Sequence, residues 1–357
     1  MIQFFVKQHT INHEKYIKRC LLIAKRGVGF TRPNPSVGAV IVYNDTIIGE
    51  GVTSVYGGNH AEVNAIQSVK DTSLIKESII YVTLEPCSHY GKTPPCADLI
   101  IKYQPKKVVI GCIDSNCLVA GKGVDRLKNA GVSVVVGVLE SECIKHHQRF
   151  FTVQEKKRPY IILKWAETKD GFIAPLLKEK QEPVWISNQY SQQLVHQWRS
   201  KEHAVLVGTS TVIDDNPKLN VRSWIGQDPV RIVLDRNLRI PKTATIFDES
   251  IQTIVITGLG MKPQQRKEKL VFEEIDFSKN IAIQICKVLQ ENHIQSVIVE
   301  GGLQTLQTFI DENLWDEARV FIGDKEFKEG IPSPNLNRSL FEQMDVHTDV
   351  LKRYVND

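Results

Sequence analysis

The sequence predicts an α/β protein of two domains, and three observations lead to this prediction. Buried-type strands alternate with amphipathic helical segments along most of the 357 residues, which is typical of layered α/β domains with partly parallel sheets. The chain is long enough to build two separate cores. A charged, proline-ended stretch interrupts the pattern, so we expect a domain at 1–150, a linker at 151–158 and a second domain at 159–357.

The composition is that of an ordinary globular protein, with 42% apolar and 24% charged residues. The net charge of +4 suits anionic small molecules and is too slight to indicate a nucleic-acid partner. We expect no membrane partner, because no apolar run reaches about 18 residues and the N-terminus lacks the features of a signal peptide. Seven scattered cysteines argue for reduced thiols and a cytoplasmic protein. Four of them should pack as small hydrophobic residues: Cys20, Cys112, Cys143 and Cys286.

Hydrophobic periodicity predicts the elements of the first domain. Apolar residues at helical spacing before Gly27 and Gly29 indicate a helix over 16–24. Two apolar runs around a turn at 44–45 indicate a hairpin. The further elements we expect are helices starting at His60 and Cys96, strands at 78–83, 107–111 and 132–138, and a helix around 124–127.

Two motifs in this domain carry metal-ligand chemistry. His60-Ala61-Glu62 opens a predicted helix, and Cys87 and Cys96 bound a loop that contains a Pro-Pro bend. One imidazole and two thiolates suit Zn²⁺, and three protein ligands leave a fourth position for water, as a catalytic site requires. Zinc lowers the pKa of that water towards neutrality, and Glu62 lies near enough to shuttle its proton. The sequence therefore predicts one catalytic zinc ion per chain.

Two simpler interpretations of these residues stay open. The zinc site could be closed and structural, with His89 or another side chain as its fourth ligand. Alternatively, Cys87 and Cys96 could form a disulfide. A short His-Ala-Glu string is weak evidence by itself, but together with Pro86-Cys87 and the second cysteine it favours catalytic zinc.

Hydrophobic periodicity also predicts strands and helices in the second domain. The elements we expect are strands at 160–166, 204–208, 230–234 and 253–257, a helix with Tyr190 and Trp198 on one side, and a final strand at 295–299. That strand runs into Glu300-Gly301-Gly302 and a further helix. Bare backbone N–H groups at such a junction can face an anion, which predicts a phosphate-binding turn. It is not the Gly-x-Gly-x-x-Gly dinucleotide fingerprint.

The first domain resembles the deaminase half of the bifunctional deaminase–reductases of riboflavin biosynthesis. The resemblance rests on residues 31–38, on His60-Ala61-Glu62 and on the loop 86–96. Nucleic-acid and nucleoside deaminases usually separate their cysteines by two residues, whereas eight intervene here. The family often has a histidine where Thr53 stands. The resemblance implies a cytidine-deaminase-like fold, zinc ligands His60, Cys87 and Cys96, catalytic Glu62, and substrate-binding Asn34.

The second domain resembles the reductase half of the same family, whose fold is related to dihydrofolate reductase. The matching segments, in the same order, are the strand ending at Asp170-Gly171, the stretch 185–187, the segment 208–217 and Gly301-Gly302. Pro183 stands where a serine is common. The resemblance implies an NADPH site lined by Ala166, Trp185, Thr211, Asp215, Gly302, Leu303, Gln304, Thr305, Leu306, Gln307 and Thr308. It implies substrate contacts by Lys164, Pro183, Arg199, Leu219, Arg222 and Glu300.

Together the two resemblances cover nearly the whole chain and imply two consecutive reactions. The first is hydrolytic deamination of 2,5-diamino-6-ribosylamino-4(3H)-pyrimidinone 5′-phosphate at its C2 amino group, and the second is reduction of the ribosyl group to ribityl by NADPH. The expected partners are phosphorylated pyrimidines, and a homo-oligomer stays open. One alternative is a nucleic-acid or nucleoside deaminase with an unrelated second domain, which would need a basic groove with stacking aromatics. Another is a non-catalytic, zinc-stabilised module.

Overall fold

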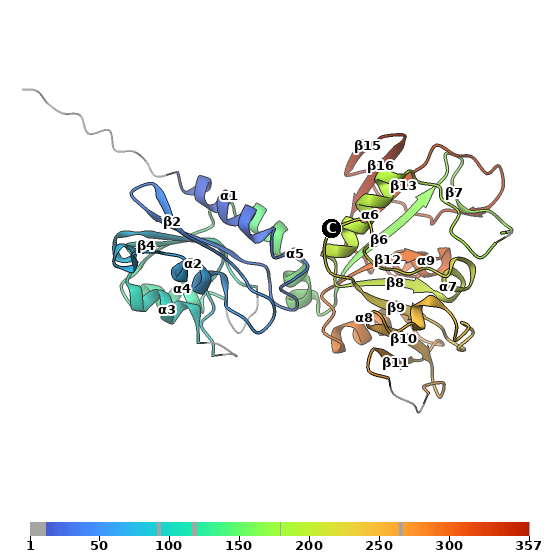
Figure 1. The fold of residues 1–357 in the computed structure, drawn as a ribbon, viewed down its shortest axis with the longest axis horizontal. Coiled ribbons are helices and arrows are strands. Elements are labelled where there is room, and N and C mark those ends of the chain that lie inside the picture. The colour runs from blue at the N-terminus through green and yellow to red at the C-terminus, as the bar shows by residue number, and fades with distance from the viewer. Residues whose placement is uncertain (1–11, 91–93, 116–119, 179, 264–266, 357) are drawn as a thin grey trace, which may run out of the picture. The chain divides into compact units, whose positions relative to one another are not determined.

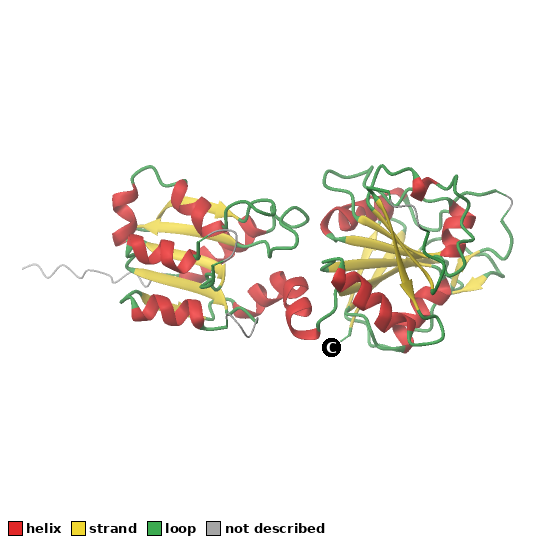
Figure 2. Cartoon of the chain, turned by 90° about the horizontal axis from the view of Figure 1, so that it is seen from below, coloured by secondary structure: helices red, strands yellow, loops and turns green. Residues whose placement is uncertain are grey.

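The computed structural model divides the chain into two compact units, residues 1–156 and 157–357 (Figure 1). It describes residues 12–90, 94–115, 120–178, 180–263 and 267–356. The boundary falls inside the charged stretch where the sequence pattern changes. Each unit consists of a sheet with helices packed against it (Figure 2), as the predicted α/β class requires.

The first unit is built on a mixed sheet with strand order β2-β1-β3-β4-β5. The hairpin β1/β2 and the pair β1/β3 are antiparallel, while β3/β4 and β4/β5 are parallel. The bounds of its elements are α1 (His13–Ala24), β1 (Gly38–Tyr43), β2 (Thr46–Val52), α2 (Ala61–Gln67), a 3₁₀ helix (Thr72–Glu77), β3 (Ile79–Leu84), α3 (Cys96–Tyr103), β4 (Lys107–Cys112), α4 (Lys122–Asn129), β5 (Ser133–Val136) and α5 (Glu140–Lys156).

Helices cover both faces of this sheet. A Cβ on Gly38 would meet the backbone of α1, and a Cβ on Gly111 would meet Cys143 of α5, so both helices lie on one face. On the other face, a Cβ on Gly51 would lie 2.2 Å from a carbonyl oxygen of α2, and α3 and α4 continue the layer beside α2. The glycines therefore allow helices to approach the strands closely. The apolar faces of strands and helices form one buried core.

The expected linker at 151–158 is corrected by the structure, because α5 continues as a helix to Lys156. Cys143, His147 and Phe151 recur every four residues and are all buried, so they form the inward stripe of this helix. Charged residues between them hide the stripe in the sequence. Only a short connection around 157–159 joins α5 to the first strand of the second unit.

The second unit is built on a larger sheet with strand order β11-β10-β9-β8-β12-β6-β13-β16-β15. Its strands are parallel from β11 to β13, and β16 and β15 add an antiparallel edge. The bounds are β6 (Tyr160–Glu167), β7 (Phe172–Ala174), α6 (Gln189–Lys201), β8 (Ala204–Gly208), α7 (Thr209–Asp215), β9 (Val230–Leu234), a 3₁₀ helix (Thr245–Phe247), β10 (Thr253–Gly258), β11 (Leu270–Ile275), α8 (Ile281–Glu291), β12 (Ser296–Gly301), α9 (Leu303–Asp311), β13 (Glu317–Ile322), β14 (Ile331–Pro332), β15 (Glu342–Val346) and β16 (Asp349–Val355).

The strand predicted at 295–299 is present as β12, but it is not the final strand. It lies in the middle of the sheet between β8 and β6, and the later strand β13 pairs in parallel with β6. At the sheet edge, β15 is largely exposed, and β16 alternates between buried and half-buried residues before a half-buried end, so neither strand has the apolar run that marked the central strands. Alternate residues of β8 face α7 on one side of the sheet and α8 and α9 on the other.

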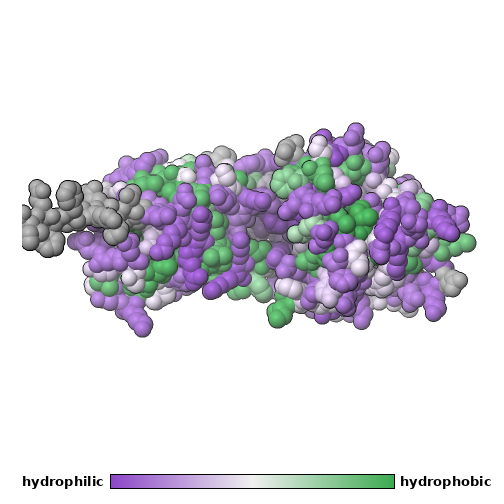
Figure 3. Space-filling model, turned by 90° about the horizontal axis from the view of Figure 1, so that it is seen from above, coloured by the Kyte–Doolittle hydropathy of each residue, from purple (hydrophilic) through white to green (hydrophobic). Residues whose placement is uncertain are grey.

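The surfaces of both units are mixed in character. On the face drawn in Figure 3, hydrophilic residues cover much of each unit and hydrophobic residues form smaller patches between them. Such scattered apolar exposure is ordinary for globular proteins. In the described part of the chain, no helix has both the length and the apolar character needed to cross a membrane. The four cysteines expected to pack as hydrophobic residues are all buried: Cys20, Cys112, Cys143 and Cys286.

Candidate active sites

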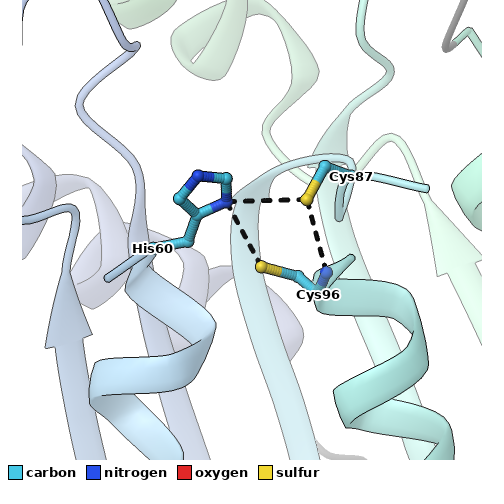
Figure 4. A group of neighbouring side chains, drawn as sticks. All are labelled: His60, Cys87 and Cys96. Carbon is cyan, nitrogen blue, oxygen red and sulfur yellow. Dashed lines mark hydrogen bonds between the residues drawn. The ribbon is translucent and has the colours of Figure 1, made fainter. Parts of the chain in front are cut away.

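Three side chains in the first unit have the arrangement of a metal site. His60, Cys87 and Cys96 point toward one another (Figure 4), and their possible ligand atoms all lie within 4.8 Å of each other. Nδ1 of His60 is 3.5 Å from the Cys87 sulfur and 3.3 Å from the Cys96 sulfur. Tetrahedral zinc with ordinary bond lengths separates such nitrogen and sulfur ligands by about 3.6 Å. The donor set and its spacing therefore fit zinc, and both cysteines are free thiols.

Local backbone structure explains why these residues meet. His60 is the N-cap of α2, one residue earlier than the predicted first turn, and Cys96 is the first residue of α3. Cys87 follows β3, and its sulfur accepts the backbone N–H of Cys96 at 3.3 Å. Three hydrogen bonds lower the pKa of the Cys87 thiol. The largest effect comes from the Cys96 thiol, and the others come from His60 and from the backbone N–H of Cys96. The positive end of the α3 dipole also favours a thiolate here.

Glu62 lies in the first turn of α2, beside the metal-ligand group. Its side chain is only 4% exposed, and it interacts with Cys96. Burial, together with the nearby Cys87, raises the pKa of Glu62 to about 7. A carboxyl group held in this position can exchange protons with a molecule bound next to the metal ligands.

Glu85 is a buried carboxylate that the sequence interpretation missed. It lies two residues before Cys87 and is 4% exposed. Its two oxygens accept four backbone N–H bonds of 2.8 to 3.2 Å, from Asp114, Gly121, Gly123 and Val124. These bonds tie the end of β3 to the start of α4, which fixes the chain just before the first cysteine. An acidic residue directly after an apolar strand was the available signal.

Arg126 of α4 holds the cysteine loop from its other side. One guanidinium nitrogen donates to the Ser88 carbonyl at 3.0 Å, and another donates to Asp98 in the first turn of α3 at 2.8 Å. Ser88 follows Cys87 directly, and Asp98 lies two residues beyond Cys96. The arginine therefore links the two ends of the loop that carries both thiols.

The other predicted residues of this unit have separate outcomes. His89 is exposed and does not belong to the metal-ligand group found among the described residues. Thr53 is buried, and its hydroxyl accepts the backbone N–H of Val37 at 3.0 Å, so it holds the start of β1. Asn34 is half-buried in the loop before β1, and its contact with substrate stays a prediction.

Four charged side chains gather near the end of β12 in the second unit, and we call them the charged cluster: Lys164, Arg199, Arg222 and Glu300. Arg199 of α6 forms a two-point ion pair with Glu300, with bonds of 2.7 and 2.6 Å. The charges of Lys164, on β6, and of Arg222, in the loop after α7, act on this pair. Three positive charges against one negative charge make this a place suited to an anion.

The charged groups of the cluster change one another's pKa values. Burial alone would raise the pKa of Glu300, but Arg199 and Lys164 outweigh it and lower that pKa to about 2. Burial lowers the pKa of Lys164, and the positive charge of Arg199 adds to this effect. Burial and Arg199 also lower the pKa of Arg222. The carboxylate is thus ionised at neutral pH, and the cationic groups crowd one another in the absence of an anion.

A second feature of this unit is the edge where β8 and β12 end side by side. Gly208 and Gly302 are the N-caps of α7 and α9, and neither helix start is capped by a side chain. A Cβ on Gly208 would lie 2.8 Å from the Thr305 hydroxyl, and one on Gly302 would lie 3.5 Å from the Thr211 hydroxyl. Ligands of parallel α/β sheets bind at such carboxyl-terminal edges, with phosphates at helix N-termini. The residues present therefore fit a dinucleotide phosphate.

Two residues predicted to line pockets have their side chains in the core, and their contacts with a ligand stay predictions. Leu306 is fully buried on the inward face of α9, where it packs with Phe309. Leu219 is 3% exposed and packs in the core beneath α7. In both cases the residue type decides the outcome, because an apolar side chain gains more from the core than from a polar ligand. Only their backbone atoms remain available to a ligand.

The remaining residues predicted for this unit lie on several segments. Asp215 forms an ion pair with Lys178. Trp185 is 47% exposed, and its carbonyl accepts a hydrogen bond from Lys325 at 2.5 Å. Pro183 is half-buried in the same loop as Trp185. The others lie on β6, or on α9 directly after Gly302: Ala166, Leu303, Gln304, Gln307 and Thr308. Their contacts with a cofactor stay predictions.

The comparisons with known proteins agree with this division. Residues 10–112 match the family model of the cytidine and deoxycytidylate deaminase zinc-binding region, and residues 159–325 match that of the RibD C-terminal domain. The riboflavin biosynthesis protein RibD of Aquifex aeolicus is 42% identical over 93% of both chains. RibD of Bacillus amyloliquefaciens is 38% identical over 86% of this chain and 83% of its own.

Solved structures give the same result for the fold. The deaminase/reductase of Thermotoga maritima superposes with a TM-score of 0.87 at 36% identity, covering 97% of this chain and 99% of its own. RibD of Acinetobacter baumannii superposes with a TM-score of 0.86 at 34% identity and the same coverage. The fold and the sites define a bifunctional enzyme, with a zinc-dependent deaminase unit followed by a reductase unit. The chain belongs to the RibD family, whose members act in riboflavin biosynthesis.

Proposed function

We propose that the first unit deaminates 2,5-diamino-6-ribosylamino-4(3H)-pyrimidinone 5′-phosphate and that the second reduces the ribosyl group of the product to ribityl. The name of the Thermotoga maritima relative, a diaminohydroxyphosphoribosylaminopyrimidine deaminase and 5-amino-6-(5-phosphoribosylamino)uracil reductase, supports this pair of substrates. The single observation that carries the first half is the convergence of His60, Cys87 and Cys96.

In the deaminase, His60, Cys87 and Cys96 would hold zinc and Glu62 would move protons. Zinc, when bound, supplies a water nucleophile at neutral pH. Glu62 is buried beside the ligands, where its carboxyl could relay both protons of that water in turn, the first to the ring nitrogen and the second to the amine that leaves as ammonia. Glu85 and Arg126 would act as positioning residues, since both hold the chain on which the thiols stand.

In the reductase, the edge at Gly208 and Gly302 would bind NADPH, and the charged cluster would bind the phosphorylated substrate. NADPH, when bound, supplies the hydride. The free N–H groups at the start of α9 favour the pyrophosphate of the cofactor. Arg222 is exposed within the charged cluster, so its guanidinium is available to grip a dianionic phosphate. Arg199 is mostly engaged by Glu300 and would act chiefly by placing that carboxylate.

The test is to supply the purified full chain with the diamino substrate, with and without NADPH. We expect ammonia release in both cases and oxidation of NADPH only after deamination. Ammonia release without any NADPH oxidation would contradict the second half of the proposal. Failure of both reactions in zinc-loaded protein would contradict both halves. A cytoplasmic location, the absence of a nucleic-acid partner and a homo-oligomeric state stay predictions.

A further inference from the structure

The main chain at residues 220–222 is fixed by three side chains. Nη1 of Arg199 donates to the carbonyl of Asn220 at 3.2 Å, and the Asp228 carboxylate accepts the N–H of Val221 at 2.6 Å. The N–H of Arg222 donates to Nδ1 of His196 at 3.4 Å. Arg222 is an exposed residue, and its Nη1 donates to Oδ1 of Asn220 at 3.3 Å. The backbone of this arginine is therefore held, while its charged end lies at the surface in a long bond to the Asn220 side chain.

His196 is well placed for this task. It lies on α6 three residues before Arg199, so both side chains project from one face of the helix toward the same loop. It is only 4% exposed. The charged groups that act on it are Arg199 on the same helix, Arg222 on the loop and Glu300 on β12. Sequence analysis did not single out this residue, because nothing in the helical pattern separates it from an ordinary core histidine.

The ring must be neutral to make the observed contact. Nδ1 accepts the Arg222 N–H, so a neutral ring carries its proton on Nε2. Burial, followed by the positive charges of Arg199 and Arg222, lowers the pKa of His196 to about 4. The same two arginines that make the site attract an anion thus keep the histidine in its accepting form at neutral pH.

We infer that His196 is a positioning residue of the reductase, which holds the main chain at Arg222 so that its guanidinium meets the phosphate of the substrate. The role rests on the proposed function of the charged cluster. His196 does not touch the reacting carbon in this account, and it acts through Arg222. If His196 only packed in the core, its loss would affect the stability of the unit, and any change in KM would be the same with and without the substrate phosphate.

Three substitutions separate these possibilities. In His196→Asn the side-chain oxygen can take the place of Nδ1, because both atoms are bonded to Cγ. In His196→Gln the oxygen lies one bond further out, near the position of Nε2. In His196→Leu no acceptor remains. The structure therefore orders the variants by their ability to bind the Arg222 N–H, with Asn first.

The experiment measures reductase kinetics on the full chain with the phosphorylated substrate and with its dephosphorylated form. We expect His196→Leu and His196→Gln to raise the KM for the phosphorylated substrate roughly three- to tenfold, as loss of one hydrogen bond does. The kcat, the KM for NADPH, the deaminase rate and the KM for the dephosphorylated substrate should stay near wild type. His196→Asn should restore the KM to within about twofold.

Other results would overturn the inference. An equal rise in KM for both substrates, or Asn behaving like Leu, would reduce His196 to a packing residue. An unchanged KM in His196→Leu would show that the loop is held without it. If the wild-type chain deaminates but fails to reduce either substrate, the proposed reductase function fails first and the role of His196 falls with it. Comparison with wild type therefore distinguishes the two failures.

Discussion

The two sites of this protein are assembled in different ways. The metal-ligand group, His60, Cys87 and Cys96, takes its side chains from one stretch of chain, residues 60–96. These side chains point at a common centre. The charged cluster takes its side chains from β6, α6, β12 and a loop, across residues 164–300. The first site has the donor set and spacing of a metal site. In the second, Arg199 and Glu300 already satisfy each other.

Because of this difference, substitutions at the two sites should affect activity and stability differently. Removing a zinc ligand removes the centre of the first site but leaves the core of its unit in place, because the ligands stand in a loop and at helix starts. Removing a member of the buried ion pair leaves its partner inside the second unit without its two-point hydrogen bonds. The first site should therefore lose activity with little loss of stability, and the second should lose both.

The largest effect is expected from Cys87→Ser in the zinc-ligand group. The variant should lose zinc and deamination together, because the remaining two ligands cannot hold the ion for turnover. Metal content and ammonia release measure this, and reductase activity on the deaminated substrate should persist. Cys286→Ala, at a buried thiol of the other unit, is the control and should keep zinc. One zinc per chain with normal turnover in Cys87→Ser would rule out the ligand assignment.

Glu62→Gln should keep zinc and lose deamination. The amide cannot shuttle protons, and general acid–base groups contribute about 10²–10⁴-fold, with the upper end expected here because several transfers depend on one residue. Zinc analysis and single-turnover rates on the same preparation check both statements. Glu77→Gln, at an exposed position of the same unit, serves as the matched control. A deaminase rate close to wild type would refute the proton-transfer role.

Arg199→Ala should destabilise the second unit by up to about 3–5 kcal/mol, since Glu300 would lose its two-point partner and keep only the charges of Lys164 and Arg222. All five tryptophans lie in residues 157–357, so their fluorescence reports the unfolding of this unit within the full chain. Arg199→Ala combined with Glu300→Ala should cost clearly less than the sum of the two single variants. Strictly additive losses would show that the pair contributes no coupling.

Arg222→Ala should weaken substrate binding without unfolding the unit. Loss of a charge-assisted bond to phosphate costs about 1.5–3 kcal/mol, which is roughly a ten- to hundredfold rise in the reductase KM. The NADPH affinity and deamination should not change. Arg338→Ala, an exposed arginine that bonds to Asn313, is the control. An unchanged KM would return Arg222 to an ordinary surface charge.

The protein should also lose stability gradually in acid. The pKa of His196 is about 4 in the fold against an ordinary 6.5, so protonation favours the unfolded chain as pH falls from 6.5 towards 4. The pKa of Glu300 is about 2 against 4.5, so its contribution is complete above 4.5 and is lost towards pH 2. Tryptophan-detected denaturation across this range checks the prediction. His196→Asn should show a flatter decline between pH 6.5 and 4, and an unchanged slope would contradict the assignment.

The two sites also differ in how much of each could be predicted from the sequence. His60, Glu62, Cys87 and Cys96 are close in the chain and have distinctive chemistry, so their grouping was predicted and the structure brings the three ligands together. Glu85 was missed, because its partners among the described residues are backbone N–H groups, which no residue type marks in the sequence. His196 was missed for a related reason, since its partner is also a backbone N–H.

The sequence by itself determined the α/β class, the two units, the zinc-ligand group and the glycine junction after β12. These follow from periodicity and from residue types within short segments, where spacing along the chain limits spacing in space. Only the tertiary structure decided that β12 is central, that 151–156 is helical, that Leu306 and Leu219 belong to the core, and that Arg199 is paired with Glu300. Each of these depends on contacts between distant segments, and burial there outweighs any local preference.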